Sequence, residues 1–238
     1  MQAVIIGASG GIGKALVEGL SQRPEIEIVH ALSRSGEGPV HEKIIPGHLD
    51  LQDEASIVAA AKTVKARGAP HLVLVASGIL SDGKDLQPEK SYRQQDAAAF
   101  QRVFEINTFG PGLVAKHFLP LFPRQGRSVF AALSARVGSI SDNRLGGWHA
   151  YRASKAALNM LIRNYAIEQT RRNQDFIAVS LHPGTVDTAL SEPFQSNVPD
   201  QQLFPPERAA KHLLQVINSL SPADTGKAFD WAGQEIPA

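Results

Sequence analysis

Short apolar segments alternate with longer helical segments along the chain, and this alternation limits the possible folds more than any other feature. The expected strands cover residues 3–7, 26–32, 43–49, 71–76, 128–133, 176–182 and 227–231. The expected helices cover residues 11–22, 53–65, 97–122, 148–172 and 206–220. Such alternation is typical of parallel βαβ units, and the nearly continuous apolar character of the first strands indicates a sheet covered on both faces. The sequence therefore predicts one α/β domain over residues 1–238, a three-layer, doubly wound Rossmann fold with a mostly seven-stranded parallel sheet.

The composition is that of a globular protein and argues against several function classes. Hydrophobic residues make up 43% of the 238 residues and charged residues 20%, with a formal net charge of +1. No basic block favours nucleic acid, no apolar run approaches the roughly 18 residues of a membrane span, and the first residues leave no room for a signal peptide. The chain has no cysteine and no HxxxH or HExxH pair. We expect a cytoplasmic protein without a metal site and without nucleic-acid or membrane partners.

A glycine-rich segment lies between the first expected strand and the first expected helix. Residues without a Cβ permit a tight turn, and the free N–H groups at the start of a helix bind a pyrophosphate. A purely structural turn is the alternative, but a strand, a glycine loop and a helix in this order favour phosphate binding. A nucleoside-triphosphatase loop is excluded because Ala15, not serine or threonine, follows Lys14. The candidate residues are Gly7, Ser9, Gly10, Gly11, Ile12 and Gly13.

The end of the second expected strand carries an arginine where NAD-binding proteins place an acid. An acidic residue about twenty residues after the glycine loop would bind the 2′-hydroxyl of the adenosine ribose. This chain has Ser33 and Arg34 there, and a guanidinium forms charge-assisted hydrogen bonds with a 2′-phosphate. A solvated loop arginine is the alternative. The pattern predicts NADPH (or NADP+) as cofactor in preference to NADH.

Tyr151 and Lys155 are four residues apart at the start of an expected helix, so both side chains project from the same face. A phenol ordinarily loses its proton near pH 10. A nearby ammonium group and a cationic nicotinamide favour the phenolate and lower the phenol pKa. An isolated pair of this kind is commonly a surface pair, but its position after a dinucleotide loop favours an acid–base role.

The combination of Gly7-x-x-x-Gly11-x-Gly13, Asn107 and Tyr151-x-x-x-Lys155 resembles the short-chain dehydrogenase/reductase family. The resemblance extends over the chain, from Asp50 after the third expected strand to Pro183-Gly184 after the sixth. Residues 134–143 and 146–155 resemble more narrowly the C-factor and sniffer-like carbonyl reductases. The resemblance implies hydride transfer between a nicotinamide cofactor and a carbonyl group, and a homodimer or homotetramer built on the helices expected over 97–122 and 148–172.

The same resemblance implies a role for each matching residue. Tyr151 would donate the proton to the carbonyl oxygen, Lys155 would bind the nicotinamide ribose and lower the Tyr151 pKa, and Asn107 would hold a water in a proton relay. A helix cap or kink is the alternative role for Asn107. Asp50 and Leu51 would contact adenine, although they could simply end a strand. The residues implied to contact the nicotinamide amide and the diphosphate are Pro183, Gly184, Thr185, Val186 and Thr188.

Two segments depart from the family pattern. The Asn-Asn-Ala-Gly motif after the fourth strand is replaced by Val75-Ala76-Ser77-Gly78, where Ser77 would substitute in part and Gly78 would still permit close backbone approach. The catalytic serine position at the end of the fifth strand falls on Ala135. Ser134 is the first candidate to replace that serine. Neighbouring strand side chains face opposite ways, so Ser134 can take the place of residue 135 only if the strand end is bulged or twisted. The alternatives are Ser139, from the following loop, or no serine at all.

These features predict an NADPH-dependent carbonyl reductase that reduces an aldehyde or ketone to an alcohol. The alternative is an NADPH-binding regulatory or signalling protein with little turnover. A serine hydrolase is excluded because the chain has no Gly-x-Ser-x-Gly elbow. Residues 188–204 are expected to form a surface loop, either a plain connection or a mobile cover over substrate. The residues expected near the pocket are largely apolar, which indicates a hydrophobic substrate. These residues are Ile79, Leu80, Val137, Trp148, Leu190 and Phe194.

Overall fold

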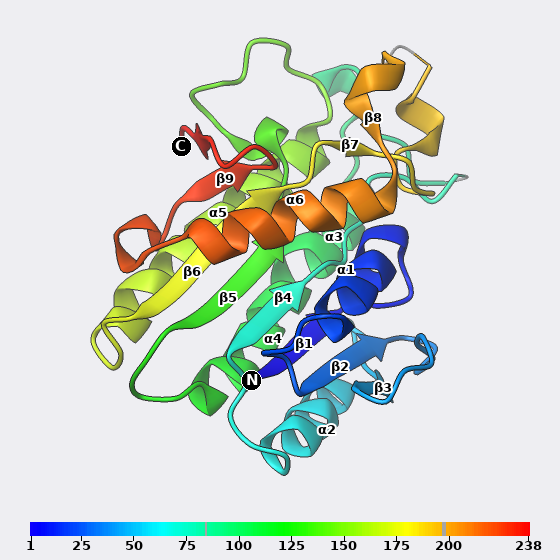
Figure 1. The fold of residues 1–238 in the computed structure, drawn as a ribbon. Helices are drawn as coiled ribbons and strands as arrows, with labels where there is room; N and C mark the ends of the chain where they lie inside the picture. The colour runs from blue at the N-terminus through cyan, green and yellow to red at the C-terminus, as the bar shows by residue number, and fades with distance from the viewer. Residues whose placement is uncertain (84, 197–198) are drawn as a thin grey trace.

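The computed structural model describes residues 1–83, 85–196 and 199–238, and its centre is an eight-stranded sheet (Figure 1). The strand order is β10-β9-β6-β5-β4-β1-β2-β3, and every pairing from β3 to β9 is parallel. The predicted doubly wound parallel sheet is therefore confirmed. The sequence did not predict the short antiparallel strand at the edge, β10. The strands are β1 (Gln2–Ile6), β2 (Ile28–Ser33), β3 (Ile44–His48), β4 (Leu72–Val75), β5 (Ser128–Leu133), β6 (Phe176–His182), β9 (Ala228–Asp230) and β10 (Glu235–Ile236).

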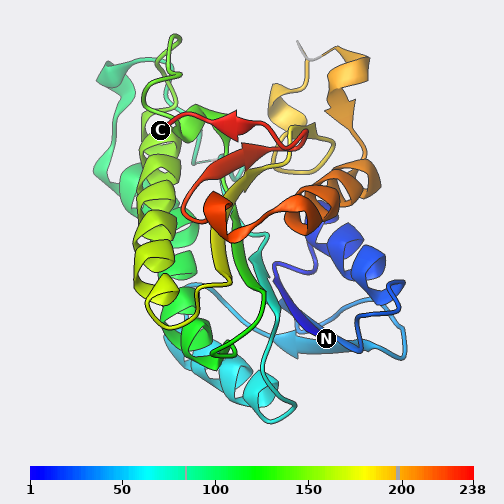
Figure 2. The same cartoon turned by 60° about the vertical axis from the view of Figure 1, so that its left-hand side comes forward.

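Helices cover both faces of the sheet, as Figure 2 shows. On one face lie α1 (Gly11–Ser21) and α6 (Pro206–Ser219), and on the other lie α2 (Glu54–Lys65), α4 (Gly110–Phe118) and α5 (His149–Thr170). The short α3 (Ala97–Phe104) packs against α5. Alternate residues of β5 point to opposite faces, so that Val129 joins the α1–α6 core while Phe130 joins the α2–α4–α5 core. Among the described residues no helix is long and apolar enough to cross a membrane.

The helix predicted over 97–122 is interrupted. After α3, residues Glu105–Phe109 form a turn of π-helix, α4 follows, and a 3₁₀ turn over Leu119–Leu121 ends the segment. The N–H of Gly110 donates to the carbonyl of Glu105, five residues earlier. Pro111 has no N–H and therefore cannot donate to the carbonyl of Asn107, four residues before it. The Gly-Pro pair is thus a local reason for the altered helix, and such turns are frequent at functional sites.

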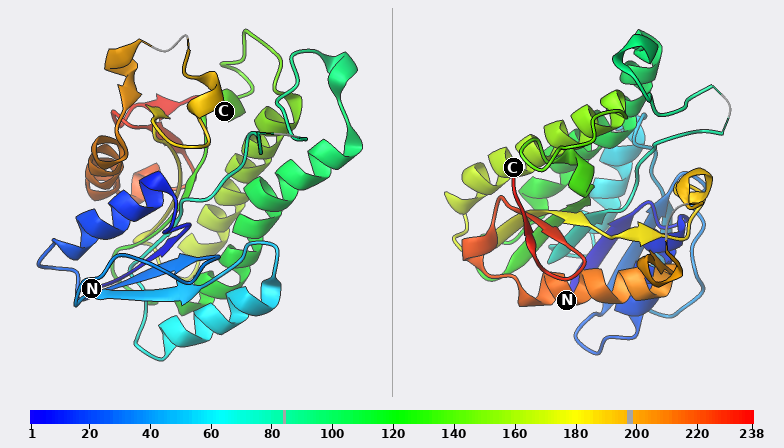
Figure 3. Two further views of the ribbon diagram at one scale, coloured as in Figure 1. Left: turned by 90° about the vertical axis from the view of Figure 1, so that its right-hand side faces the viewer. Right: turned by 90° about the horizontal axis from the view of Figure 1, so that it is seen from above.

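The carboxyl ends of the parallel strands form one edge of the sheet, here called the carboxyl edge, and the candidate site lies there. The strand order reverses between β1 and β4, and the connections at such a point leave a crevice for ligands. Figure 3 (left) shows the segments that follow β4, β5 and β6 lying together above this edge.

The loop expected over residues 188–204 contains some regular structure. Strand β7 (Thr185–Val186) pairs in parallel with β8 (Leu203–Phe204), and 3₁₀ turns cover Glu192–Phe194 and Asp200–Gln202. Asn197 and Val198 lie outside the described residues. The other described residues of this segment have no regular structure, and a role as a mobile cover stays a prediction.

Candidate active site

The glycine-rich loop leads directly from β1 into α1. The N–H groups of Gly7 and Ala8 both donate to the carbonyl of Leu32, at 2.8 and 3.0 Å, and Gly7 has a φ of 91°. A Cβ on Gly13 would lie 2.1 Å from the Gly7 carbonyl oxygen. Any side chain at this position would force the helix or the turn to shift, because the helix passes directly against the turn.

The start of α1 is suited to an anion. Its N-cap residue, Gly10, provides no side-chain cap, and its first turn holds no acidic residue. Ser9, Gly10 and Gly11 are exposed, so the first N–H groups of the helix are open on that side. Exposed helix N-termini of this kind bind phosphate through backbone N–H groups and the helix dipole. The residues present therefore fit the diphosphate of a dinucleotide.

The end of β2 carries the pair predicted to contact the adenosine ribose. Ser33 is buried, and its hydroxyl contacts the hydroxyl of Ser35 and donates to the carbonyl of Glu37, both at 3.2 Å. Arg34 is exposed beside it and, within the described parts of the chain, forms no salt bridge. The guanidinium of Arg34 is the group here that remains able to bind a phosphate, and Ser33 mainly stabilises the loop.

Asp50 and Leu51 follow β3. The Asp50 carboxylate accepts from the N–H of Gln52 at 3.0 Å, which stabilises the turn before α2. Leu51 is buried against α4, where a Cβ on Gly110 would lie 2.6 Å from the Leu51 Cβ. Both residues therefore have a structural role, and contact with adenine stays a prediction.

The segment after β4 connects the phosphate loop with the catalytic residues. A Cβ on Gly7 would lie 2.4 Å from the Ser77 Oγ, so Ser77 sits against the glycine loop. A Cβ on Gly78 would lie 3.3 Å from both the Asn107 Oδ1 and the Lys155 Nζ. Ala76, at the start of this segment, packs against the α1–α6 core. Gly78 therefore lies directly against the side chains of Asn107 and Lys155, and close backbone approach to a cofactor stays a prediction.

Asn107 lies fully buried in the π-helical turn. Its Oδ1 accepts from the N–H of Ile79 at 2.8 Å, and its Nδ2 donates to the carbonyl of Ile79 at 2.9 Å and to the Ser154 Oγ at 3.1 Å. The amide is thus fully used in fixing the segment after β4 to α5. The backbone carbonyl of Asn107, which Pro111 cannot reach with an N–H, is the polar group that could bind a water.

Tyr151 and Lys155 lie in the first two turns of α5, 9% and 3% exposed. The Lys155 Nζ donates to the carbonyl of Leu133 at 2.8 Å and lies 5.8 Å from the centre of the Tyr151 ring. The common face predicted from the spacing of the two residues is therefore present. Lys155 projects from α5 toward the end of β5 and toward Gly78, which follows β4.

The acid–base properties of the pair are dominated by burial. Burial raises the pKa of Tyr151 to about 12 and lowers the pKa of Lys155 to about 8. The protein alone therefore shifts the phenol pKa upward, whereas the sequence predicted a downward shift from Lys155 together with a cationic nicotinamide. At neutral pH the phenol is protonated and the lysine is mostly charged. This is the state needed to donate a proton to a carbonyl oxygen.

Ser134 and Ser139, the two candidates for the catalytic serine near the end of β5, differ in their hydrogen bonds. Ser134 is 6% exposed, and its hydroxyl has no hydrogen-bond partner among the described residues. Ser139 is also buried, but its Oγ accepts from the N–H of Asp142 at 3.1 Å. The unused hydroxyl of Ser134 favours it over Ser139, and a catalytic role for either stays a prediction.

The segment after β6 reaches back to the glycine loop. Gly184 has a φ of 82°, and a Cβ there would lie 3.0 Å from the ring of Phe204. A Cβ on Gly11 would lie 3.0 Å from the Thr188 Cγ2. Residues 183–188, with Val186 buried and Pro183 and Thr185 half-buried, thus adjoin the start of α1. The nicotinamide contacts implied for this segment stay predictions, but its position suits them.

Two residues that hold the site together were not identified from the sequence. Ser154 is fully buried; its hydroxyl donates to the carbonyl of Tyr151 at 2.8 Å and accepts from Asn107. Its position directly before Lys155 is the one signal that could have identified it. Glu89 is also buried, and its carboxylate accepts from the N–H of Ala150. Nothing in the local sequence links Glu89 to a helix 61 residues later.

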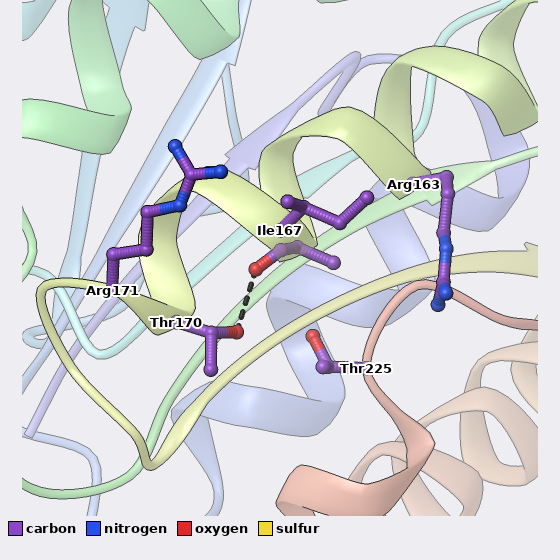
Figure 4. Close-up of a pocket in the computed structure, with 6 residues that line it drawn as sticks. Arg163, Ile167, Thr170, Arg171 and Thr225 are labelled. Atoms are coloured by element: carbon purple, nitrogen blue, oxygen red, sulfur yellow. Dashed lines mark hydrogen bonds between the residues drawn. The ribbon is translucent and has the colours of Figure 1, made fainter.

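A separate depression lies toward the other end of α5. It has a volume of about 330 Å³ and is lined by Arg163, Ala166, Ile167, Thr170, Arg171 and Thr225 (Figure 4). Thr170 donates to the carbonyl of Ala166 at 2.6 Å, which leaves its methyl group on the lining. The depression contains none of the candidate catalytic or cofactor-binding residues. We therefore place the chemistry at the carboxyl edge of the sheet and not in this depression.

Comparison with known proteins shows which family the chain belongs to. A model of the short-chain dehydrogenase family matches residues 1–199. The C-signal protein of Myxococcus xanthus is 37% identical over 142 residues, covering 60% of this chain and 80% of that protein. The NADPH-bound carbonyl reductase from chicken fatty liver is 26% identical, with a TM-score of 0.86 over 99% of this chain and 98% of that one.

The carbonyl reductase Sniffer of D. melanogaster has the same fold, with 20% identity and a TM-score of 0.84 over 100% of this chain and 99% of that one. The family match is the decisive finding because it spans most of the chain. This chain belongs to the short-chain dehydrogenase family.

Proposed function

We propose that this protein is an NADPH-dependent reductase of aldehydes or ketones. The observation that carries the proposal is the buried pair at the start of α5, with a protonated Tyr151 beside a charged Lys155. The pair lies at the same sheet edge as the exposed start of α1. The likeness to a carbonyl reductase with bound NADPH supports this reading.

Each of these residues has a separate role in the proposed reaction. The N–H groups at the start of α1 bind the diphosphate, and Arg34 binds the 2′-phosphate of the adenosine ribose. NADPH supplies the hydride when bound. Tyr151 donates its proton to the carbonyl oxygen, and Lys155 binds the nicotinamide ribose and stabilises the phenolate that forms. The backbone carbonyl of Asn107 holds a water through which the proton is replaced.

The test is loss of NADPH absorbance with purified protein and a panel of aldehydes, ketones and quinones. Turnover with any of these compounds that requires Tyr151 supports the proposal. Tight NADPH binding without turnover across the panel contradicts it and favours the alternative, an NADPH-binding regulatory protein. One observation supports that alternative, namely the alanine at position 135, where the family resemblance implies a hydroxyl residue.

Replacing Arg34 with alanine is expected to raise the KM for NADPH by about 10- to 100-fold, the cost of losing charge-assisted hydrogen bonds to a phosphate. The KM for NADH, which lacks that phosphate, should change less than about threefold. Steady-state kinetics with both cofactors measure the effect. Arg124→Ala is the matched control because Arg124 is exposed in the loop before β5, at the opposite edge of the sheet. Equal losses for NADPH and NADH would show that Arg34 does not bind the 2′-phosphate.

The ionisation of Lys155 is expected to determine how kcat/KM for NADPH depends on pH. Its pKa of about 8 means that the side chain is charged below that pH and neutral above it, whereas Tyr151, with a pKa of about 12, stays protonated. The kcat/KM for NADPH reports the free enzyme. We expect it to be constant from pH 6 to 7 and to fall up to tenfold per pH unit above about 8. In Lys155→Arg, which stays charged, the same fall at the same pH would rule out Lys155 as its source.

We further propose a homodimer formed by α4 and α5. Three apolar side chains on these helices and the adjoining π turn are markedly exposed, namely Phe109, Met160 and Ile167. Ile167 also lines the depression in Figure 4, so the apolar surface continues along α5. Exposed apolar surface of this kind commonly forms a subunit interface. Light scattering should give twice the chain mass, or four times for a tetramer, and Met160→Lys should shift the protein toward the monomer. A wild-type monomer would contradict this assignment.

A further inference from the structure

Trp148, the residue directly before α5, has an unfavourable backbone conformation. With φ at 51° and ψ at 45°, it is the one non-glycine residue of positive φ within residues 1–83, 85–196 and 199–238. Gly146 and Gly147 before it also have positive φ, at 63° and 66°. A bulky side chain is rare in this region, and such residues persist where the surrounding structure fixes them, often at functional sites. Glycine would fit this backbone better, so the indole side chain itself needs an explanation.

Glu89 fixes this conformation from a distant segment. The N–H of Trp148 donates to the Glu89 carbonyl at 2.5 Å, and the N–H of Ala150 lies 3.3 Å from both Glu89 carboxylate oxygens. Trp148 provides no side-chain cap for α5, so the buried carboxylate of Glu89 performs that function. One residue therefore holds both the backbone of Trp148 and the first turn of the helix that carries Tyr151.

The indole of Trp148 lies between Tyr151 and Phe194. Its centre is 6.2 Å from the Tyr151 ring, nearly perpendicular at 78°, and 5.2 Å from the Phe194 ring at 58°. Phe194 belongs to the segment after β6, which is far from α5 in the sequence. Trp148 and Phe194 are both half-buried, so part of each ring remains open to a ligand. We therefore expect a carbonyl compound bound at the Tyr151 hydroxyl to bring its substituents near these two rings.

We propose that Trp148 and Phe194 are specificity-determining residues that favour carbonyl compounds with an aromatic ring on the carbonyl carbon. Glu89 acts as a positioning residue for Trp148. A planar ring gains from edge or offset contact with two aromatic side chains, whereas a saturated ring of similar size gains apolar burial alone. The inference rests on the proposed reductase activity and names the substrate class of that site.

The first experiment compares benzaldehyde with cyclohexanecarbaldehyde, which has a saturated ring of the same carbon number. The measured quantity is the ratio of their kcat/KM values with NADPH. In Trp148→Leu this ratio should fall about tenfold, and in Phe194→Leu about threefold, the size expected for lost aromatic contacts. Trp148→Phe should retain most of the wild-type ratio. Equal losses for both aldehydes in Trp148→Leu would overturn the inference while leaving the reductase activity established.

Variants at Glu89 test the positioning role. Glu89→Ala removes the carboxylate that accepts from the N–H of Ala150, the second residue after Trp148, while the backbone carbonyl that accepts from Trp148 remains. The benzaldehyde to cyclohexanecarbaldehyde ratio should therefore fall, by less than in Trp148→Leu. Glu89→Gln should restore much of it, because the amide oxygen still accepts from Ala150. Glu168→Ala is the matched control, an exposed glutamate further along α5. A lower melting temperature for Glu89→Ala with an unchanged ratio would reduce Glu89 to a structural residue and overturn its role in specificity.

A binding experiment separates this inference from the proposed activity. Trp231→Phe leaves Trp148 as the sole tryptophan of the chain, so its fluorescence reports the site. Titration with benzamide in the presence of NADP+ should change this fluorescence at concentrations at least about tenfold lower than cyclohexanecarboxamide requires. If the wild type reduces neither these aldehydes nor any other compound of the panel, the proposed function fails and this titration decides the aromatic site alone. Equal responses to the two amides would overturn it.

Discussion

Replacing Tyr151 with phenylalanine is expected to lower kcat for carbonyl reduction by about 100- to 10,000-fold, the usual contribution of a positioned proton donor. The substitution removes one oxygen atom from a buried side chain and leaves its ring in place against Trp148. The effect should therefore appear in kcat, while NADPH affinity changes less than about threefold. Single-turnover reduction followed by NADPH absorbance, with NADPH fluorescence for binding, measures both quantities.

Tyr165→Phe is the control for this prediction. Tyr165 lies on the same helix, and burial, with a smaller effect of Glu168, raises its pKa to about 12 as well. Its ring packs on Phe130 in the core, 6.0 Å between ring centres, and it takes no part in the site. If both variants lost the same activity, the loss would reflect a damaged α5 and not a missing proton. If neither lost activity, a group other than Tyr151 would donate the proton.

The parts of the site that the sequence predicted correctly are those determined by local spacing. The order of strand, glycine turn and helix requires only residues 3–22, and four-residue spacing places Tyr151 and Lys155 on one helix face whatever surrounds them. Alternating apolar segments likewise predict a parallel sheet because each strand must be covered on both faces.

The features that the sequence did not predict depend on contacts between distant segments. Glu89 reads as one charged residue in a polar loop, and only the folded chain brings it to the start of α5. The π turn at Asn107 was predicted as ordinary helix because apolar periodicity does not distinguish five-residue from four-residue hydrogen bonding. Strand β10 has two residues, too few for a recognisable alternation pattern.

The direction of the Tyr151 pKa shift could not be predicted from spacing for a related reason. Spacing shows which charge lies nearby, but burial of the phenol becomes known only from the packing around α5, and burial sets the direction of the shift. The same burial lowers the pKa of Lys155, so the two pKa values move apart, to about 12 for the phenol and about 8 for the ammonium group. A phenol that keeps its proton suits reduction of a carbonyl better than oxidation of an alcohol.

Replacing Gly13 with alanine is expected to lower the free energy of unfolding by about 3 kcal/mol, at the upper end of overpacking costs. The melting temperature of a chain of this size should then fall by roughly 6 to 12 °C. Intrinsic helix propensity predicts the opposite sign, because alanine favours a helix over glycine by about 1 kcal/mol. The new Cβ, however, would lie 2.1 Å from the Gly7 carbonyl oxygen, a backbone atom with little room to move. Thermal and denaturant unfolding measure the change.

Gly10→Ala distinguishes this steric effect from a general need for glycine in the loop. Gly10 has a φ of −77° and a ψ of 159°, which alanine adopts readily, and its Cβ would meet the Gly7 carbonyl oxygen at an ordinary 3.5 Å. We therefore expect the free energy of unfolding of Gly10→Ala to lie within about 1 kcal/mol of the wild-type value. NADPH affinity should fall at least about tenfold in Gly13→Ala, because the displaced turn misaligns the N–H groups that bind the diphosphate. Equal stability losses in the two variants would contradict the steric argument, whereas a stable Gly13→Ala with normal NADPH binding would show that α1 can move away from the turn without loss of its anion site.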